Sequence, residues 1–170
     1  MHIYRSASIS SVKCYKLLYE IHTKFTHVIN NVRCPAGYSL YSQSCGRFCY
    51  RYEANACKDW DNARATCQAE GGDLLVPTEC NYQYFREQAE TIVGICDSEF
   101  WLGAQRPTNG ADFITVEGDT ISNTANFWKQ GQPDNTNGTE NCLEMRRDYD
   151  LLANDLKCSQ LSGYICQVIL

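Results

Sequence analysis

The sequence predicts an α+β domain with short strands first, two helices next, then a long loop region and closing strands. The chain has 170 residues, which corresponds to one domain of about 150 residues and a short extension. Hydrophobic residues make up 44% and charged residues 21%, values typical of a globular domain that can bury a core. Capping signals and alternating apolar residues, taken below in chain order, predict the individual elements.

Cysteine is unusually frequent, with 11 residues in the chain. The cysteines form no CxxC pair and none of the cysteine–histidine spacings of structural zinc sites, so the sequence predicts disulfides. Disulfides indicate an oxidising compartment and therefore a secreted or extracellular protein. The first twenty residues are basic and Ser-rich without the apolar stretch of a signal peptide, and an organelle transit peptide is the alternative interpretation. No run of 18 apolar residues is present, so we expect no membrane span.

Charge is unevenly distributed along the chain. Residues 1–33 carry five basic side chains against Glu20 alone, a net +4, which leaves −9 for residues 34–170 of the total of −5. An acidic domain does not favour nucleic acid as a partner but suits a hard cation. All three histidines lie in residues 1–33, which excludes histidine-based catalysis and histidine-ligated zinc from the domain. The many carboxylates could in principle include a glycosidase-type pair, but we expect that the protein is not an enzyme.

Residues 1–33 are predicted to form a basic leader, and residues 34–170 the main domain. Apolar residues in the leader alternate at spacings of four and three, the pattern of a coiled-coil seam. These residues are Cys14, Leu18, Ile21, Phe25, Val28 and Val32. One interpretation is a short helical neck that assembles a homo-oligomer, with Cys14 able to make it covalent. The other is a poorly ordered leader, because the seam spans fewer than three heptads.

The first predicted elements of the domain are a hairpin and a helix. Residues 34–52 contain short strand-like runs broken by Gly and Ser, which is typical of a hairpin. Asp59 can cap the helix and the pair Gly71-Gly72 can end it. The face of this helix that turns inward is predicted to hold Trp60, Ala63 and Cys67.

A second helix is predicted after Pro77, with Thr78 as its cap and Gly94 as its end. Its apolar stripe consists of Tyr82, Phe85, Ala89 and Ile92. Residues 102–152 are rich in Gly, Asn and Asp and show no helical period. We expect a functional loop region there, because an idle loop of about 50 residues is rare in a compact domain. Residues 162–170 alternate as in a strand.

Ten short sequence pieces occur in an order and spacing typical of one known family. They are CPAGY with a second cysteine at Cys45, WDNARATC ending at Cys67, GGDLLVP, WLGA (101–104), NFW (126–128), QPD (132–134), ENC (140–142), AND (153–155), Cys158, and YIC ending at Cys166. On these residues the sequence resembles the C-type lectin-like family over residues 34–168. The resemblance implies a disulfide-bonded fold with two helices, short antiparallel sheets and a long calcium-binding loop region.

The resemblance also implies a set of disulfides. It pairs Cys67 with Cys166, Cys142 with Cys158, and Cys34 with Cys45, although Cys49 is a rival partner for Cys34. The remaining cysteines are Cys14, Cys49, Cys57, Cys80 and Cys96. Because the total is odd, at least one cysteine is free or bonded to another molecule. We expect no Cys80–Cys96 bond, because a helix of about 13 residues would hold them ~20 Å apart.

Five oxygen-bearing residues match the positions that ligate calcium and contact sugar in this family. They are Gln132, Asp134, Glu140, Asn154 and Asp155. Carboxylate and amide oxygens are the ligands that Ca²⁺ prefers, so the resemblance implies Ca²⁺ as the cofactor. It further implies that Pro133 follows a cis bond; an ordinary trans proline in a turn is the alternative interpretation.

The order of these residues around the proline suggests the sugar. By resemblance, QPD accompanies galactose or N-acetylgalactosamine, so glycans ending in these sugars are the expected partners. Thr136 occupies the place of the usual aromatic platform, and Tyr149 is the nearest substitute for contact with the sugar. Asn137 begins a glycosylation sequon beside the site. The alternative function is a lectin-like module that binds a protein or surface and uses calcium only to hold its loops.

Overall fold

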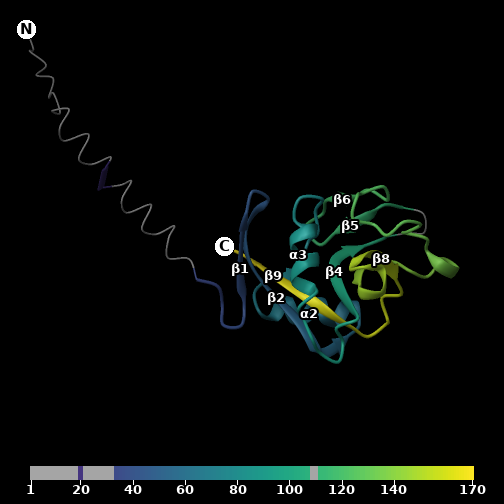
Figure 1. The fold of residues 1–170 in the computed structure, drawn as a ribbon, viewed down its shortest axis with the longest axis horizontal. Coiled ribbons are helices and arrows are strands. Elements are labelled where there is room, and N and C mark those ends of the chain that lie inside the picture. The colour runs from purple at the N-terminus through teal and green to yellow at the C-terminus, as the bar shows by residue number, and fades with distance from the viewer. Residues whose placement is uncertain (1–18, 21–32, 108–110) are drawn as a thin grey trace, which may run out of the picture. The chain divides into compact units, whose positions relative to one another are not determined.

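The computed structural model describes residues 19–20, 33–107 and 111–170 (Figure 1). The chain divides into two units, residues 1–33 and Cys34–Leu170. The apolar seam predicted for the leader and Cys14 lie outside the described residues, so the neck and the oligomer remain predictions. The account below concerns Cys34–Leu170.

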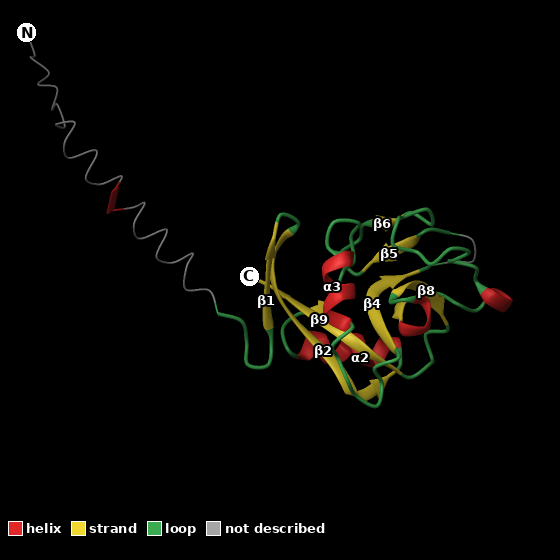
Figure 2. Cartoon of the chain, in the orientation of Figure 1, coloured by secondary structure: helices red, strands yellow, loops and turns green. Residues whose placement is uncertain are grey.

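The second unit begins with the predicted hairpin, formed by β1 (Ser39–Gln43) and β2 (Gly46–Lys58). β2 pairs antiparallel with the last strand, β9 (Ser162–Ile169), so the two ends of the unit share one sheet. β9 in turn pairs in parallel with β4 (Glu99–Gln105), which departs from the purely antiparallel pairing we expected. Figure 2 shows β1 at one edge of the domain, with β9 and β4 further in.

Shorter strands extend this sheet on both sides of β4. Within the described residues the main strand order is β1-β2-β9-β4-β5-β6, with β3 on β9 and β7 between β4 and β8. The remaining strands are β3 (Asp73–Leu74), β5 (Phe113–Thr115), β6 (Thr120–Ile121), β7 (Cys142–Arg146) and β8 (Leu152–Leu156). The 3-10 turns are η1 (Thr136–Gly138) and η2 (Arg147–Tyr149). Among its described residues, the predicted loop region (102–152) therefore contains three complete strands of two to five residues, namely β5, β6 and β7, and β8 begins at its last residue.

The first predicted helix is confirmed as α2 (Trp60–Ala69). The Asp59 side chain accepts a hydrogen bond from the Asn62 amide at 2.9 Å, as an N-cap should. The buried face consists of Trp60, Ala63 and Cys67, as the spacing predicts. This face packs against Leu74, Trp101, Tyr164 and Cys166.

The second helix, α3 (Tyr82–Ala89), begins one turn later than predicted. Thr78 does not cap it: the Thr78 side chain accepts from the Asn81 amide, and Asn81 accepts from the Thr78 amide. The two residues therefore cap the turn that precedes the helix, and Asn81 occupies the helix N-cap position. The stripe is confirmed, because Tyr82, Phe85 and Ala89 are buried in the core. Ile92 lies beyond the helix and packs against the same core.

Five disulfides join all ten cysteines of the described residues. They are Cys34–Cys49, Cys45–Cys80, Cys57–Cys96, Cys67–Cys166 and Cys142–Cys158. The two long-range pairs implied by the family are formed, and Cys80 and Cys96 do not bond to each other. The predicted Cys34–Cys45 pair is wrong. Cys45 lies in the turn at the tip of the hairpin, whereas Cys49 lies back along β2 opposite Leu40.

No helix in the described part of the chain is long and apolar enough to cross a membrane.

Candidate metal and ligand site

Three carboxylates converge where the segment before β7 meets strand β8. Asp134 and Glu140 flank η1, and Asp155 lies in β8. One oxygen atom from each lies within 4.8 Å of the other two. Figure 1 shows this end of the domain, around β8, on the side opposite the β1–β2 hairpin.

A backbone amide holds the two loop carboxylates toward each other. The Thr136 amide donates to Asp134 Oδ1 at 3.0 Å and to Glu140 Oε2 at 3.1 Å. The Thr136 hydroxyl also donates to Asp134 Oδ1, at 2.8 Å. The Glu140 amide donates to the side chain of Asn135. Thr136, noted in the sequence only as a missing aromatic residue, therefore organises the loop.

Asp155 connects the loop to the core and has no exposed surface. Its two oxygens accept from the backbone amides of Asp134 and Asn135, at 3.0 and 2.9 Å. Oδ2 also accepts from Arg106 Nη2 at 2.9 Å, and this pair is buried. Arg106, the residue that follows β4, is a member of the site that the sequence did not reveal.

Negative charge accumulates at Glu140. Burial raises the pKa of the Glu140 carboxyl above its ordinary value, and the charges of Asp155 and Asp134 raise it further, against the Thr136 amide bond, which lowers it. Repulsion of this kind is relieved when a cation binds. Three hard oxygen ligands in one place are the donors that Ca²⁺ takes, so the residues fit the ion that the sequence implies.

The matching family model, described as the lectin C-type domain, covers residues 56–168. The chain belongs to the C-type lectin domain family. The resemblance stated from the sequence is confirmed, and membership supports carbohydrate binding as the general activity and a non-enzymatic role.

Individual relatives of this C-type lectin domain agree with the assignment. "Salivary C-type lectin 1" of Aedes albopictus is 30% identical over 71% of this chain and 81% of its own length. "CD209 antigen-like protein D" of Mus musculus is 27% identical over 80% of this chain, which spans 52% of that relative. Among solved structures, the C-type lectin CEL-I from Cucumaria echinata has a TM-score of 0.65 at 25% identity and covers 80% of this chain and 97% of its own.

The two predicted amide ligands of the C-type lectin domain are bonded to neighbours. Gln132 Oε1 accepts from the Asp134 amide at 2.9 Å. Asn154 is buried, and its Nδ2 donates at 2.7 Å to Glu144, its partner across the β7–β8 ladder. The bond between Gln132 and Pro133 is cis, as the resemblance implies.

Glu144 is a second residue that the sequence did not reveal. It has no exposed surface, and burial raises the pKa of its carboxyl to about 7, although bonds from Asn154 and Arg146 lower it. The sequence offered one signal for it. Glu144 stands between Leu143 and Met145, two apolar residues that alternate along the buried strand β7.

Two further residues named from the sequence lie in the two 3-10 turns. Tyr149, in η2, is half-buried, and its ring is contacted by Lys129 and Arg146 at 5.8 and 5.4 Å. Asn137 is exposed in η1 with a positive φ of 57°.

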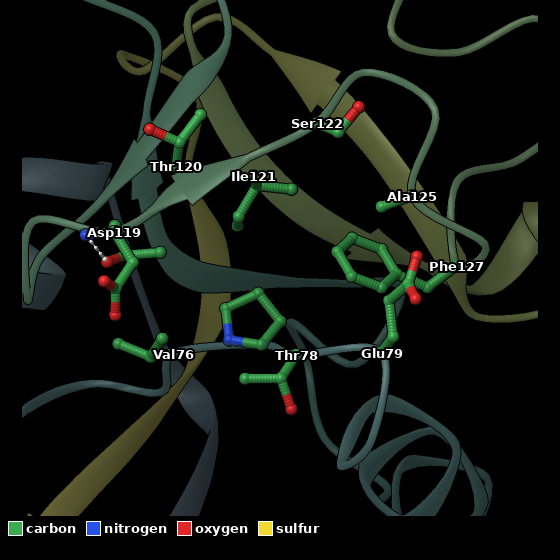
Figure 3. A pocket seen from close by; sticks show the side chains of 11 residues that line it. Val76, Thr78, Glu79, Asp119, Thr120, Ile121, Ser122, Ala125 and Phe127 are labelled. Carbon is green, nitrogen blue, oxygen red and sulfur yellow. Dashed lines mark hydrogen bonds between the residues drawn. The ribbon is translucent and has the colours of Figure 1, made fainter.

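A pocket of about 320 Å³ lies apart from these residues, between the β5–β6 hairpin and the turn before α3 (Figure 3). Pro77, Ile121 and Phe127 are among the residues that line it, and Glu79 and Asp119 lie at opposite sides of it. None of the predicted calcium ligands lines this pocket.

Proposed function

We propose that this C-type lectin domain binds carbohydrate through Ca²⁺ held by Asp134, Glu140 and Asp155. Gln132 and Asn154 complete the set through their amide oxygens. The convergence of the three carboxylates within 4.8 Å, in the loop that the family uses, supports this assignment.

The ion, when bound, offers coordination positions that two neighbouring sugar hydroxyls fill. The chain's own residues orient the hydroxyls: carboxylates of Asp134 and Glu140 accept hydrogen bonds, and the Gln132 and Asn154 amides donate. We propose terminal galactose or N-acetylgalactosamine as the preferred ligand, from the order Gln132-Pro133-Asp134. With Thr136 in place of an aromatic platform, Tyr149 is the proposed ring for contact with the sugar.

Retention on immobilised galactose, with release by a calcium chelator, tests the proposal. Asp134→Asn and Glu140→Gln should each weaken retention by at least about tenfold, because each removes a charged oxygen ligand. The matched control is Glu90→Gln, an exposed acid at the end of α3, which should bind as the wild type does. Equal retention with and without chelator would refute the calcium mechanism.

A second candidate function is binding of a protein or other surface, with calcium only holding the loops. Its support is that the Gln132 carbonyl and the Asn154 amide nitrogen are already bonded within the chain. In that case calcium would still bind, while the protein would not be retained on immobilised galactose, N-acetylgalactosamine or mannose.

We propose that the protein acts outside cells, because five disulfides persist in oxidising surroundings and a similar mosquito protein is named salivary. We also propose that the leader and Cys14 assemble several copies, which would strengthen binding by weak single sites. Light scattering before and after reduction tests the assembly.

A further inference from the structure

Arg106 places a positive charge inside the acidic site. Its Nη2 lies 2.9 Å from Asp155 Oδ2, and the side chains are 3% and 0% exposed. A charge buried this deeply is screened little by water or salt, so it acts on every carboxylate of the site.

The side chain and the backbone of Arg106 are each held by a contact of their own. Its centre lies 4.7 Å from the centroid of the Phe113 ring, a cation–π contact with β5. The Arg106 amide donates to the Asn141 carbonyl at 2.7 Å, next to Glu140. The charge therefore cannot move out to solvent without breaking the contacts of the guanidinium with Asp155 and Phe113.

Asp155 connects Arg106 to the backbone of the ligand loop. The same Oδ2 that accepts from Arg106 accepts from the Asn135 amide, and Oδ1 accepts from the Asp134 amide. If Arg106 were neutral, a buried carboxylate would be left without its charge partner, which is strongly unfavourable. The segment that carries Asp134 would then lose its anchor unless another cation took over.

We propose that Arg106 is a built-in counter-charge that keeps the ligand loop formed without calcium. This inference rests on the proposed calcium site. It makes the loop pre-organised before ion binding, and it places Arg106 and the ion in partly redundant roles toward Asp155. The chain's affinity for calcium is then set by Arg106 as well as by the ligands.

Because Arg106 and calcium have partly redundant roles, loss of Arg106 should affect the loop differently from loss of a residue that only packs. Loss of a packing contact loosens the loop equally with and without calcium. Loss of the counter-charge loosens it mainly when calcium is absent, because the ion neutralises Asp155 when present.

The test compares Arg106→Met, which removes the charge, with Arg106→Lys, which keeps it, in the full chain. Amide hydrogen exchange of residues 131–141 is measured in chelator and in saturating Ca²⁺. Arg106→Met should lower protection in chelator by at least about tenfold and in calcium by much less, and Arg106→Lys should restore most of it. Equal losses in both buffers, or no loss in chelator, would overturn the proposal.

A double variant keeps the test decisive if the wild type binds no calcium. Arg106→Met with Asp155→Asn removes both charges, so in chelator its loop should be better protected than that of Arg106→Met alone. Additive losses would show that Arg106 only packs. Absence of calcium binding to the wild type, measured by calorimetry, would refute the proposed function without deciding the role of Arg106.

Discussion

Short polar side chains shape the ligand loop by bonding to nearby backbone amides. Gln132 Oε1 accepts from the Asp134 amide, and Asp134 Oδ1 accepts from both the amide and the hydroxyl of Thr136. Each of these acceptors is a carbonyl-type oxygen, which Gln, Glu, Asn and Asp all possess. An exchange of acid and amide at positions 132 and 134 therefore preserves the loop's own bonds.

The exchange Gln132→Glu with Asp134→Asn tests whether these residues select the sugar. It conserves size and total charge but reverses which side of the ion accepts and which donates. Hydroxyls left against the wrong partner cost about 1 to 3 kcal/mol each, so competition assays should show preference moving from galactose toward mannose by about tenfold. Calcium affinity, measured by calorimetry, is the control and should change little. Unchanged galactose binding would favour the protein-binding alternative.

Helix α2 is fixed by the residue that precedes it and by the turn that follows it. Asp59 caps the start, and the pKa of its carboxyl is lowered mainly by the hydrogen bond from the Asn62 amide. At the end, a Cβ added to Gly72 would lie 1.9 Å from the Gln167 carbonyl oxygen, so β9 packs directly on this turn. The helix can lie this close to the sheet because position 72 has no side chain.

Asp59→Ala should lower the free energy of unfolding by about 1 kcal/mol at neutral pH, since the cap bond is lost. The folded pKa of Asp59 is lowered, so its contribution is present above the unfolded pKa of about 3.9 and is lost as pH falls through the folded value. Urea unfolding at pH 7 and pH 3 should therefore show a smaller difference between variant and wild type at pH 3. An equal difference at both pH values would contradict the cap assignment.

Gly72→Ala should lower the free energy of unfolding by about 1 to 3 kcal/mol, because backbone must shift to admit the methyl group. The measurement is the urea midpoint, with Ala69→Ser at the exposed end of α2 as a mild control. A midpoint like that of the control would contradict the close approach seen at Gln167.

Local signals predicted the elements with strong periodicity, namely the hairpin, α2 and the stripe of α3. Strands β5 and β6 have three and two residues, too few for alternation to be recognised, so the sequence showed only a loop region. They form because β4 offers its edge to β5 and Phe113 is buried beside Trp128. Pairing between strands that are distant in the sequence cannot be predicted from any short segment.

The site was predictable to the same degree. The carboxylates of the site could be named from the order of the motifs, but the residues that form hydrogen bonds and ion pairs with them could not. Arg106 and Asp155 are 49 residues apart, and only the paired strands bring them together. Thr136 was recognised for the aromatic ring it replaces, because the hydrogen bonds of its amide depend on the turn that it helps to form.

At the scale of the whole molecule, two disulfides have different roles, one in the stability of the fold and one in the geometry of the site. Cys67–Cys166 joins α2 to β9 across a sequence separation of 99 residues. Cys142–Cys158 spans 16 residues that include β7 and β8, and hence Asp155. The first bond therefore constrains the fold, and the second constrains the strands beside the ligand loop.

Removing each bond by a pair of Cys→Ser changes should separate these roles. In the chain-entropy model, loss of Cys67–Cys166 lowers the free energy of unfolding by about 4 to 5 kcal/mol, and loss of Cys142–Cys158 by about 3 kcal/mol. Calcium affinity, measured by calorimetry well below each variant's unfolding midpoint, should fall clearly only without Cys142–Cys158, because that bond holds β8 and Asp155 against β7. If the variant without Cys67–Cys166 lost calcium affinity as much while still folded, the site would depend on the whole sheet and not on the β7–β8 pair.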